Sequence, residues 1–373
     1  MNAIGAQPGS EKKRVFVALS GGVDSAVAAA LLVEQGYDVV AVMLRLWADT
    51  DAEGVQRPNR CCLPEAVERA RRVADLLNIP FYLLNAELPF EAGVVRYFIS
   101  EYAAGRTPNP CVHCNRLIRF DFLLKRAMAM GAEFIATGHY ARVRKVDGLY
   151  QLLRGRDRRK DQSYFLHILT QEQLAHVMFP VGELTKEEVR KIARQRGLPV
   201  AEQPESQDLC FMVTADYREF LVRHAPHLFR PGPIRDTSGR VLGQHRGLPA
   251  YTIGQRKGLG VAYPKPLYVL ALDAAENTLI VGTAEELGRD ECLVEDVHYI
   301  AGTSPPSPFR AGVEIRYHGR TVEATVTPLD GDRAWVHFDS PQRDITPGQF
   351  LVMYDGEVVL GGGVICNTLQ PVL

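Results

Sequence analysis

The segment "VFVALSGGVDSAV" constrains the fold most, because a short apolar strand passes through two glycines directly into a helix. Glycine lets the backbone turn sharply and approach a ligand closely, and the free N–H groups at a helix start attract anions. Ser20 and Ser25 add hydroxyl groups, whereas Asp24 is itself an anion, which indicates helix capping or a role with Mg²⁺. An ordinary glycine turn is the alternative, but the whole string after an apolar strand predicts a phosphate-binding loop. The Gly-Lys-Ser/Thr ending of the Walker motif is missing.

Strands and helices alternate from Arg14 to about Ile168. The expected strands are "RVFVALS", "YDVVAVMLRLW", "IPFYLL" and "EFIATGHY", and the expected helices are "DSAVAAALLVEQG", 63–78, 90–103 and 115–130. Strands separated by helices of this length predict a parallel sheet covered on both faces. From about residue 230 the chain is rich in glycine and proline, and from about 290 short alternating strands predict a small antiparallel barrel.

Length and charge bound the class of protein. A chain of 373 residues is expected to form two or three domains. The net charge is −1, so a nucleic-acid partner has to be met by a local basic surface. Residues 142–160 hold eight basic and two acidic side chains, a density typical of a solvated face or of a phosphate-contacting strip. Neither a signal peptide nor a bilayer span is expected, which predicts a cytoplasmic protein without a membrane partner.

The seven cysteines are an odd number in a long chain of this kind, which favours reactive or metal-binding thiols over disulfides. The adjacent Cys61 and Cys62 form a poor chelate, because neighbouring side chains on a helix do not face each other. Cys292 and Cys366 lie in strand-like stretches and are expected to be buried as small apolar residues.

The string "TPNPCVHCNRLIRF" places Cys111 and Cys114 three positions apart. Cys114 is expected in the first turn of the helix 115–130, where the helix N-terminus favours the reactive thiolate. The apolar face of this helix is expected to consist of Leu117, Phe120, Leu124 and Met128.

Six strings follow one another in a fixed order: SGGVDS, TPNPCVHCNRLIRF, ATGHYAR, KDQSYFL, SQDLCFM and YTIGQRKGLG. SGGVDS resembles the PP-loop of the ATP pyrophosphatases, and the whole set resembles the bacterial tRNA-specific 2-thiouridylases of that superfamily, from about Arg14 to Ile365. The resemblance implies an α/β protein with a doubly wound parallel-sheet PP-loop domain (adenine nucleotide alpha hydrolase-like), a small central domain and a C-terminal antiparallel β-barrel. The expected ranges are a flexible N-terminus at 1–13, the PP-loop domain at 14–212, the central domain at 213–288 and the barrel at 289–373.

The resemblance also implies an activity, ligands and site residues. The expected reaction adenylates the C2 oxygen of the wobble uridine with ATP and replaces it by sulfur, releasing AMP and pyrophosphate. The expected ATP contacts are Ala18, Leu19, Ser20, Gly21, Gly22, Val23, Asp24, Ser25, Met43 and Gly138. The expected tRNA contacts are Asn109, Pro110, Cys111, His139, Lys160, Asp161, Gln162, Arg316, Tyr317 and Gln349. His139 is alternatively a satisfied histidine at a strand end.

The thiols leave alternatives open. The resemblance makes Cys210 the persulfide carrier and Cys114 the second catalytic cysteine, with sulfur delivered by a cysteine desulfurase or a sulfur-carrier relay protein. Relatives of the family carry an aspartate at the position of Cys111, so Cys111 replaces that acid–base group or joins Cys114 and Cys210 in holding a [4Fe–4S] cluster. A PP-loop synthetase that adenylates another substrate and a zinc-bound RNA-binding module are rival hypotheses. The protein is expected to be a monomer when free of tRNA.

Overall fold

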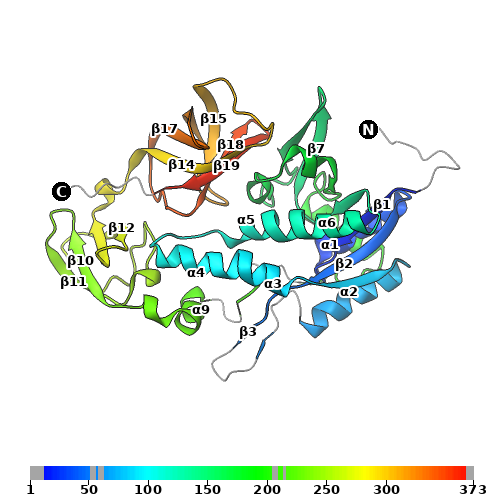
Figure 1. The fold of residues 1–373 in the computed structure, drawn as a ribbon, viewed down its shortest axis with the longest axis horizontal. Helices are drawn as coiled ribbons and strands as arrows, with labels where there is room; N and C mark the ends of the chain where they lie inside the picture. The colour runs from blue at the N-terminus through cyan, green and yellow to red at the C-terminus, as the bar shows by residue number, and fades with distance from the viewer. Residues whose placement is uncertain (1–11, 51–55, 58–62, 204–208, 213–215, 367–373) are drawn as a thin grey trace. The chain divides into compact units, whose positions relative to one another are not determined.

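A computed structural model describes residues 12–50, 56–57, 63–203, 209–212 and 216–366, so Cys61 and Cys62 lie outside the described residues. The chain forms two compact units, drawn as a ribbon in Figure 1. The first unit comprises Met1–Glu91 and Cys114–Val213, and the second comprises Ala92–His113 and Thr214–Leu373. Among the described residues, no helix combines the length and the apolar character needed to cross a bilayer.

A five-stranded parallel sheet forms the centre of the first unit. Its strands are β1 (Arg14–Ala18), β2 (Asp38–Arg45), β5 (Phe81–Asn85), β6 (Phe134–Ala136) and β9 (Val177–Met178). They are arranged in the order β5-β2-β1-β6-β9, and every pairing is parallel. The order changes direction between β1 and β6, and open α/β sheets bind ligands at the carboxyl ends of the strands that flank such a point. The parallel sheet predicted from the strand and helix alternation is confirmed.

Helices α1 (Val23–Glu34), α2 (Pro64–Leu76) and α8 (Lys186–Gln195) pack with this sheet in one apolar core. Helix α1 is rich in alanine, which has the highest intrinsic helix propensity and lets neighbouring backbones approach closely. The other elements of the unit are α3 (Glu87–Phe90), the hairpin β7 (Ala141–Val146) and β8 (Leu149–Arg154), η4 (Ser163–Leu166), α7 (Gln171–Ala175) and the short strands β3 (Asp49–Thr50) and β4 (Gln56–Arg57).

The helix that carries the CxxC motif differs from its predicted form. It starts at Pro110, not at residue 115, and runs through α5 (Pro110–Cys114), the π-helical η3 (Asn115–Leu123) and α6 (Leu124–Ala129). The first-turn position predicted for Cys114 is therefore wrong, because Cys111 occupies the first turn. The wider π-helical turn also rotates the apolar face, so Leu117 and Met128 are exposed, contrary to the prediction. Ile118, Leu123 and Ala127 are buried with Phe120 and Leu124.

The second unit contains two sheets and a small set of helices. The helices are η2 (Glu91–Val95, whose first residue belongs to the first unit), α4 (Arg96–Ala103), α9 (Tyr217–His224), η5 (Pro226–Leu228), η6 (Leu248–Ala250) and η7 (Ala284–Glu286). The first sheet has the order β11-β10-β13-β12, with β10 (Gly232–Asp236), β11 (Val241–His245), β12 (Tyr268–Asp273) and β13 (Thr278–Gly282).

The second sheet of this unit closes into a six-stranded antiparallel barrel, which confirms the predicted C-terminal barrel. Its strands are β14 (Arg289–Tyr299), β15 (Phe309–Glu314), β16 (Val322–Leu329), β17 (Arg333–Gln342), β18 (Phe350–Asp355) and β19 (Val358–Ile365). Closure comes from the pairing of β14 with both β17 and β19. Cys292 is fully buried in the barrel core, as predicted, whereas Cys366 follows β19 and is only half-buried.

The turn before β18 holds the chain segment that precedes Cys111. The Thr107 N–H donates to the Pro347 carbonyl (2.8 Å), and the Gln349 side-chain amide donates to the Thr107 carbonyl (2.9 Å). Between these two residues Gly348 has φ +88°. A Cβ at Gly348 would lie 3.0 Å from Arg106 Cβ and 3.0 Å from the backbone N and O of Thr107. Only glycine lets the barrel turn and this segment approach so closely.

Replacement of Gly348 by alanine tests this contact. Gly348→Ala is expected to lower the free energy of unfolding by about 3 kcal/mol, from a left-handed backbone and a crowded methyl group together. Gly356→Ala is the matched control, since Gly356 also has positive φ (+56°) but nothing within 4 Å of its added Cβ. It should cost only about 1–2 kcal/mol. Urea unfolding of both variants measures the difference, and equal losses would show that the close approach carries no energy.

Candidate active site

The phosphate loop between β1 and α1 is organised by its own hydroxyl groups. The Ser25 hydroxyl accepts a hydrogen bond from the Ser20 N–H (3.2 Å) and donates to the Gly22 carbonyl (3.1 Å). Gly21 has φ +73°, and a Cβ there would lie 2.7 Å from the Ala66 carbonyl oxygen. The loop therefore keeps a conformation in which only glycine fits at this position.

The loop after β6 lies directly against the start of α1. A Cβ at Gly138 would be 2.6 Å from the Ser25 nitrogen and 2.7 Å from the Asp24 carbonyl carbon. The side chains of Leu19, Val23 and Met43 are buried in the core. At these predicted ATP-binding positions, only the backbone is available to a ligand. Ala18 is half-buried at the end of β1.

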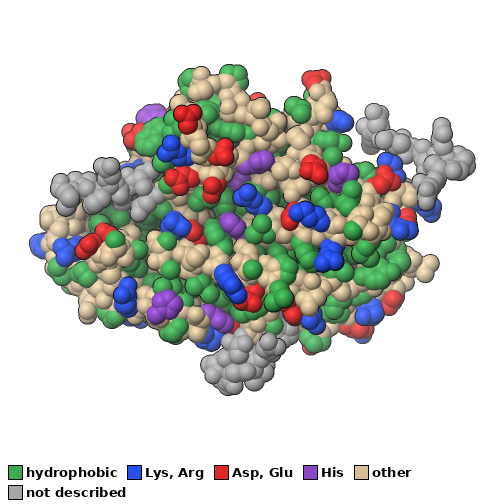
Figure 2. All heavy atoms as spheres, in the orientation of Figure 1, with side chains coloured by type: hydrophobic (Ala, Val, Ile, Leu, Met, Phe, Trp, Pro, Cys, Tyr) green, Lys and Arg blue, Asp and Glu red, His purple; other side chains and the backbone are tan. Residues whose placement is uncertain are grey.

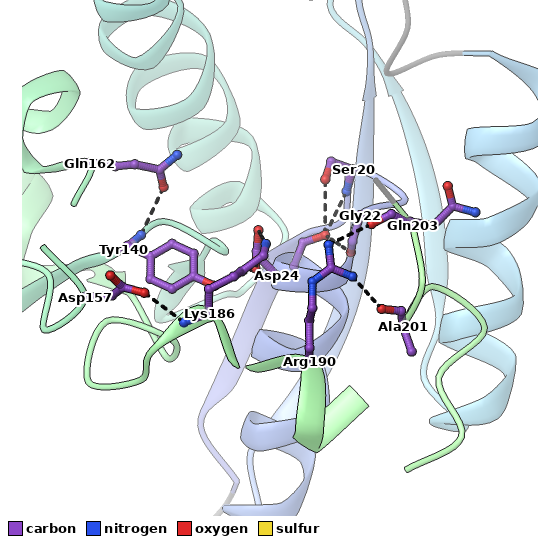
Figure 3. A network of polar contacts seen from close by, with 11 residues as sticks. Ser20, Gly22, Asp24, Tyr140, Asp157, Gln162, Lys186, Arg190, Ala201 and Gln203 are labelled. Carbon is purple, nitrogen blue, oxygen red and sulfur yellow. Dashed lines mark hydrogen bonds and ion pairs between the residues drawn. The ribbon is translucent and has the colours of Figure 1, made fainter. Parts of the chain in front are cut away.

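The Asp24 carboxylate is compensated by two neighbouring side chains (Figure 3). The Lys186 ammonium donates to both carboxylate oxygens (2.7 and 2.8 Å), and the Tyr140 hydroxyl donates to Oδ1 (2.7 Å). Helix α1 is capped by Gly22 without any side-chain hydrogen bond. The prediction that Asp24 caps the helix is thus wrong, because its carboxylate points to Lys186 and Tyr140 instead of to the backbone of α1.

Lys186 was missed by the sequence analysis. Its side chain is only 10% exposed, and it extends from the first residue of α8. A cation in the first turn of a helix is disfavoured by the helix dipole, so a lysine directly after the N-cap Thr185 is a signal that a local anion compensates it. Tyr140 belongs to the quoted "ATGHYAR" string but carried no predicted role.

The segment 155–162, here called the basic loop, joins β8 to η4. The Asp161 carboxylate accepts hydrogen bonds from the backbone N–H of Gly155 (2.9 Å) and of Ser163 (3.0 Å), and it pairs with Arg154 (3.2 Å). Both partners of this ion pair are buried, so the carboxylate holds the loop together. Arg156, Arg158 and Arg159 are exposed and Lys160 is half-buried. Arg154 is therefore not one of the exposed cations in the basic stretch 142–160.

Gln162 joins the basic loop to Tyr140. Its side-chain carbonyl accepts the Tyr140 N–H (3.0 Å), and its backbone N–H donates to the Tyr140 carbonyl (2.9 Å). Of the predicted site residues, the structure thus brings Gln162 and Asp24 together through Tyr140.

His139 is buried, with a partner on each ring nitrogen. Arginine is only a donor, so the Arg119 guanidinium donates to Nε2 (3.2 Å), and the proton on Nδ1 is donated to the Thr137 hydroxyl (2.7 Å). Burial, reinforced by the Arg119 charge, lowers the pKa of His139 to about 3. The imidazole is consequently neutral at neutral pH. Arg119 had no predicted role.

The predicted reactive thiols differ in exposure. Cys114 is buried, Cys210 is half-buried and Cys111 is exposed. Phe211 packs against Phe90 with ring centroids 5.9 Å apart, which anchors the chain next to Cys210. In the part of the chain that the structure describes, no three His, Cys, Asp or Glu side chains are gathered as a metal site.

The remaining predicted tRNA contacts belong to the second unit. Asn109 is half-buried, and Pro110 is buried at the start of α5, where proline is favoured. Gln349 donates to the carbonyls of the segment before Asn109, as described above. Arg316 and Tyr317 follow β15, and Arg316 pairs with Asp344 (3.4 Å). On the face drawn in Figure 2, acidic and basic side chains are interspersed.

Three family models match the chain: a tRNA methyl transferase HUP domain at 13–214, a tRNA methyl transferase PRC-barrel domain at 218–283 and an aminomethyltransferase beta-barrel domain at 289–365. The tRNA-specific 2-thiouridylase MnmA of Magnetococcus marinus is 51% identical, covering 95% of this chain and 99% of that protein. The corresponding MnmA of Moorella thermoacetica is 52% identical over 95% of this chain and 100% of its own length. The chain belongs to the MnmA family of tRNA-specific 2-thiouridylases.

Among solved structures, the MnmA-family chain matches the U34-tRNA thiolase NcsA from Methanococcus maripaludis with its [4Fe-4S] cluster at 18% identity. The match covers 58% of this chain and 68% of that chain, with a TM-score of 0.35. This similarity is too low to support an inference about the thiols of this MnmA-family member.

The low pKa of His139 predicts a pH dependence of stability. Unfolded histidine takes up a proton below about pH 6.5, whereas folded His139 stays neutral down to about pH 3. Unfolding is therefore favoured by about 1.4 kcal/mol for each pH unit between about pH 6 and pH 4. His139→Gln removes this contribution. The wild type should lose about 2–3 kcal/mol more than His139→Gln from pH 6 to pH 4 in urea unfolding, and parallel curves would contradict the low pKa.

Proposed function

We propose that the chain is an ATP-dependent tRNA 2-thiouridylase, which replaces the C2 oxygen of the wobble uridine by sulfur. The observation that carries this proposal is 51% identity to a tRNA-specific 2-thiouridylase along almost the whole chain. It is supported by a phosphate loop at the point where the strand order of the parallel sheet changes direction. A phosphate-binding loop is what a reaction that consumes ATP requires.

ATP binds along the loop that follows β1. Its phosphates contact the backbone of 18–25, and its nucleoside part contacts the backbone of Met43 and Gly138. A Mg²⁺ ion would accompany the triphosphate and would need one or two carboxylates from the protein. Asp24 is the carboxylate of this loop that fits as a protein ligand. When bound, the metal ion neutralises phosphate charge.

The first half of the reaction makes the C2 oxygen a leaving group. The oxygen attacks the α-phosphorus of ATP, an O–P bond forms, and the bond to pyrophosphate breaks. The adenylated oxygen can then leave as AMP. Proton transfer from N3 of the uracil ring accompanies this step, and Cys111 is the proposed acid–base group in place of an aspartate.

The second half transfers sulfur from Cys210. A donor protein first leaves a persulfide on Cys210. Attack of Cys114 on the inner sulfur releases sulfide, which adds to C2 and displaces AMP. One Cys114–Cys210 disulfide forms in each turnover, and an external thiol reductant has to reduce it. No step is assigned to a [4Fe–4S] cluster.

The RNA contacts divide between the two units. In the first unit His139, Lys160, Asp161 and Gln162 contact the tRNA; the Asp161 carboxylate is occupied internally, so its contact is made by the backbone. In the second unit the contacts are Asn109, Pro110, Cys111, Arg316, Tyr317 and Gln349. An anticodon-loop uridine is single-stranded and can turn into a pocket at modest cost.

The remaining assignments are also part of the proposal. The domains comprise 14–212, 213–288 and 289–373, after an N-terminus at 1–13. Sulfur comes from a cysteine desulfurase or a relay protein, and the enzyme is a cytoplasmic monomer when free of tRNA.

Nucleoside mass spectrometry tests the activity directly. Unmodified tRNA incubated with the protein, ATP, Mg²⁺ and a sulfur donor is expected to yield 2-thiouridine. Cys210→Ser should yield none, because a serine carries no persulfide. Cys366→Ser is the matched control and should retain the wild-type yield, since Cys366 lies outside the proposed site. Unchanged thiolation by Cys210→Ser would exclude the persulfide route.

Cys111→Asp separates the two roles considered for Cys111. As an acid–base group, an aspartate substitutes for the thiol, so the variant should thiolate tRNA in air, without iron, at a rate within about tenfold of the wild type. An aspartate is a poorer ligand than a cysteine thiolate for a [4Fe–4S] cluster, so the cluster role predicts an inactive variant. Anaerobic purification with iron and sulfide analysis accompanies the assay. Four irons per chain in the wild type and an inactive Cys111→Asp would overturn the acid–base role.

A further inference from the structure

Two chains of contacts lead from the basic loop to the phosphate loop, and both end on the Asp24 carboxylate (Figure 3). All of their members belong to the first unit. The basic loop is the proposed contact for RNA phosphates, and Asp24 is in the proposed ATP loop, so the inference rests on the proposed function.

The first chain of contacts passes through Asp157 and Lys186. Asp157 is buried although its neighbours Arg156 and Arg158 are exposed. Its Oδ1 accepts the backbone N–H of Arg159 (3.1 Å), and its Oδ2 accepts the backbone N–H of Lys186 (3.0 Å). The Lys186 ammonium in turn binds both oxygens of Asp24. One carboxylate thus joins the exposed cations to the residue whose charge compensates Asp24.

The second chain of contacts passes through Gln162 and Tyr140. Gln162 makes hydrogen bonds to both the N–H and the carbonyl of Tyr140. The Tyr140 hydroxyl then donates to Asp24 Oδ1 (2.7 Å). Gly155 reinforces the contact, because a Cβ there would lie 2.7 Å from the Tyr140 carbonyl oxygen. The basic loop is therefore packed directly against the backbone of Tyr140.

The helix pair α1 and α8 provides an internal comparison. A second ion pair, Arg196 with Glu34, joins the other ends of the same two helices. This pair lies at the end of α1 that is away from the phosphate loop. Its two described hydrogen bonds join Arg196 to Glu34 and do not involve the basic loop. If the Asp24–Lys186 ion pair only held the two helices together, its loss would have the same effect as loss of the Glu34–Arg196 pair.

The geometry points to Asp157 and Tyr140 as positioning residues that couple RNA binding to ATP binding. Phosphate brought to Arg158, Arg159 and Lys160 shifts the backbone that Asp157 holds, and Asp157 transmits this shift to Lys186. A displaced Lys186 offers its ammonium to the triphosphate and leaves the Asp24 carboxylate free to hold the Mg²⁺ ion proposed to accompany ATP. ATP binding is then strengthened by RNA, and RNA binding is strengthened equally by ATP, because coupling between two sites is reciprocal.

The test measures the coupling itself. The dissociation constant of α,β-methylene ATP with Mg²⁺ is determined by calorimetry, with and without a saturating anticodon stem-loop RNA that carries uridine at the wobble position. The wild type is expected to bind the analogue about tenfold more tightly with RNA, within the range typical of coupled sites. Asp157→Asn keeps the shape but replaces one acceptor by a donor, and it should reduce this factor to about two.

Tyr140→Phe is the second variant, because it removes only the hydroxyl and its hydrogen bond to Asp24. It should reduce the coupling partially, and the double variant should bring the factor to about one. Arg196→Gln is the control and should keep the wild-type factor. Thermal unfolding shows which variants are folded.

The outcomes separate the coupling from the function. A wild-type factor of one, or an equal loss in Arg196→Gln and Asp157→Asn, overturns the coupling even if the wild type produces 2-thiouridine. Loss of the factor only in the Asp157 and Tyr140 variants supports it. Absence of 2-thiouridine in the mass spectrometric assay of the wild type would overturn the proposed function instead, whatever the coupling factor.

Discussion

A carboxylate lies in the first turn of α1, beside backbone amides that favour anions, and its charge has to be compensated before a phosphate can approach. The compensation comes from Lys186, whose ammonium is nearly buried on Asp24. Two unit charges about 4 Å apart interact with about 4 kcal/mol at an effective dielectric constant of 20. An Asp24 carboxylate compensated neither by Lys186 nor by Mg²⁺ would therefore oppose triphosphate binding strongly. The same ion pair joins the start of α8 to the start of α1.

The start of α8 is secured against the unfavourable placement of a cation at a helix N-terminus. Thr185 and Glu188 form a capping box, in which the Thr185 hydroxyl accepts the Glu188 N–H (3.2 Å) and Glu188 accepts the Thr185 N–H (2.7 Å). The Thr185 backbone hydrogen bond is also the main cause that lowers the pKa of Glu188. Asp157 binds the next N–H of the helix. The position of Lys186 is thus fixed both by hydrogen bonds at the start of α8 and by its ion pair with Asp24.

The sequence predicted the local elements better than their contacts. The apolar strand, the two glycines and the alanine-rich helix were sufficient to predict the phosphate loop, because its chemistry lies in six consecutive residues. The strand order β5-β2-β1-β6-β9 depends on pairing between distant segments, which no local pattern encodes. The π-helical turn at η3 was missed for the same reason, since its side chains fit a core that other segments build.

Lys186 and Tyr140 approach Asp24 from 162 and 116 residues away. Only the misplaced charge of Lys186 at a helix start gave a local sign of that contact.

The state of His139 limits the proton transfers that the proposed site can make. A histidine with a pKa of about 3 is neutral, and its one unprotonated nitrogen already accepts a hydrogen bond from Arg119. It therefore has no free lone pair with which to act as a base. The Arg119 guanidinium remains charged and is half-buried. The proposed mechanism assigns acid–base work on the uracil ring to Cys111, an exposed thiol in the first turn of α5.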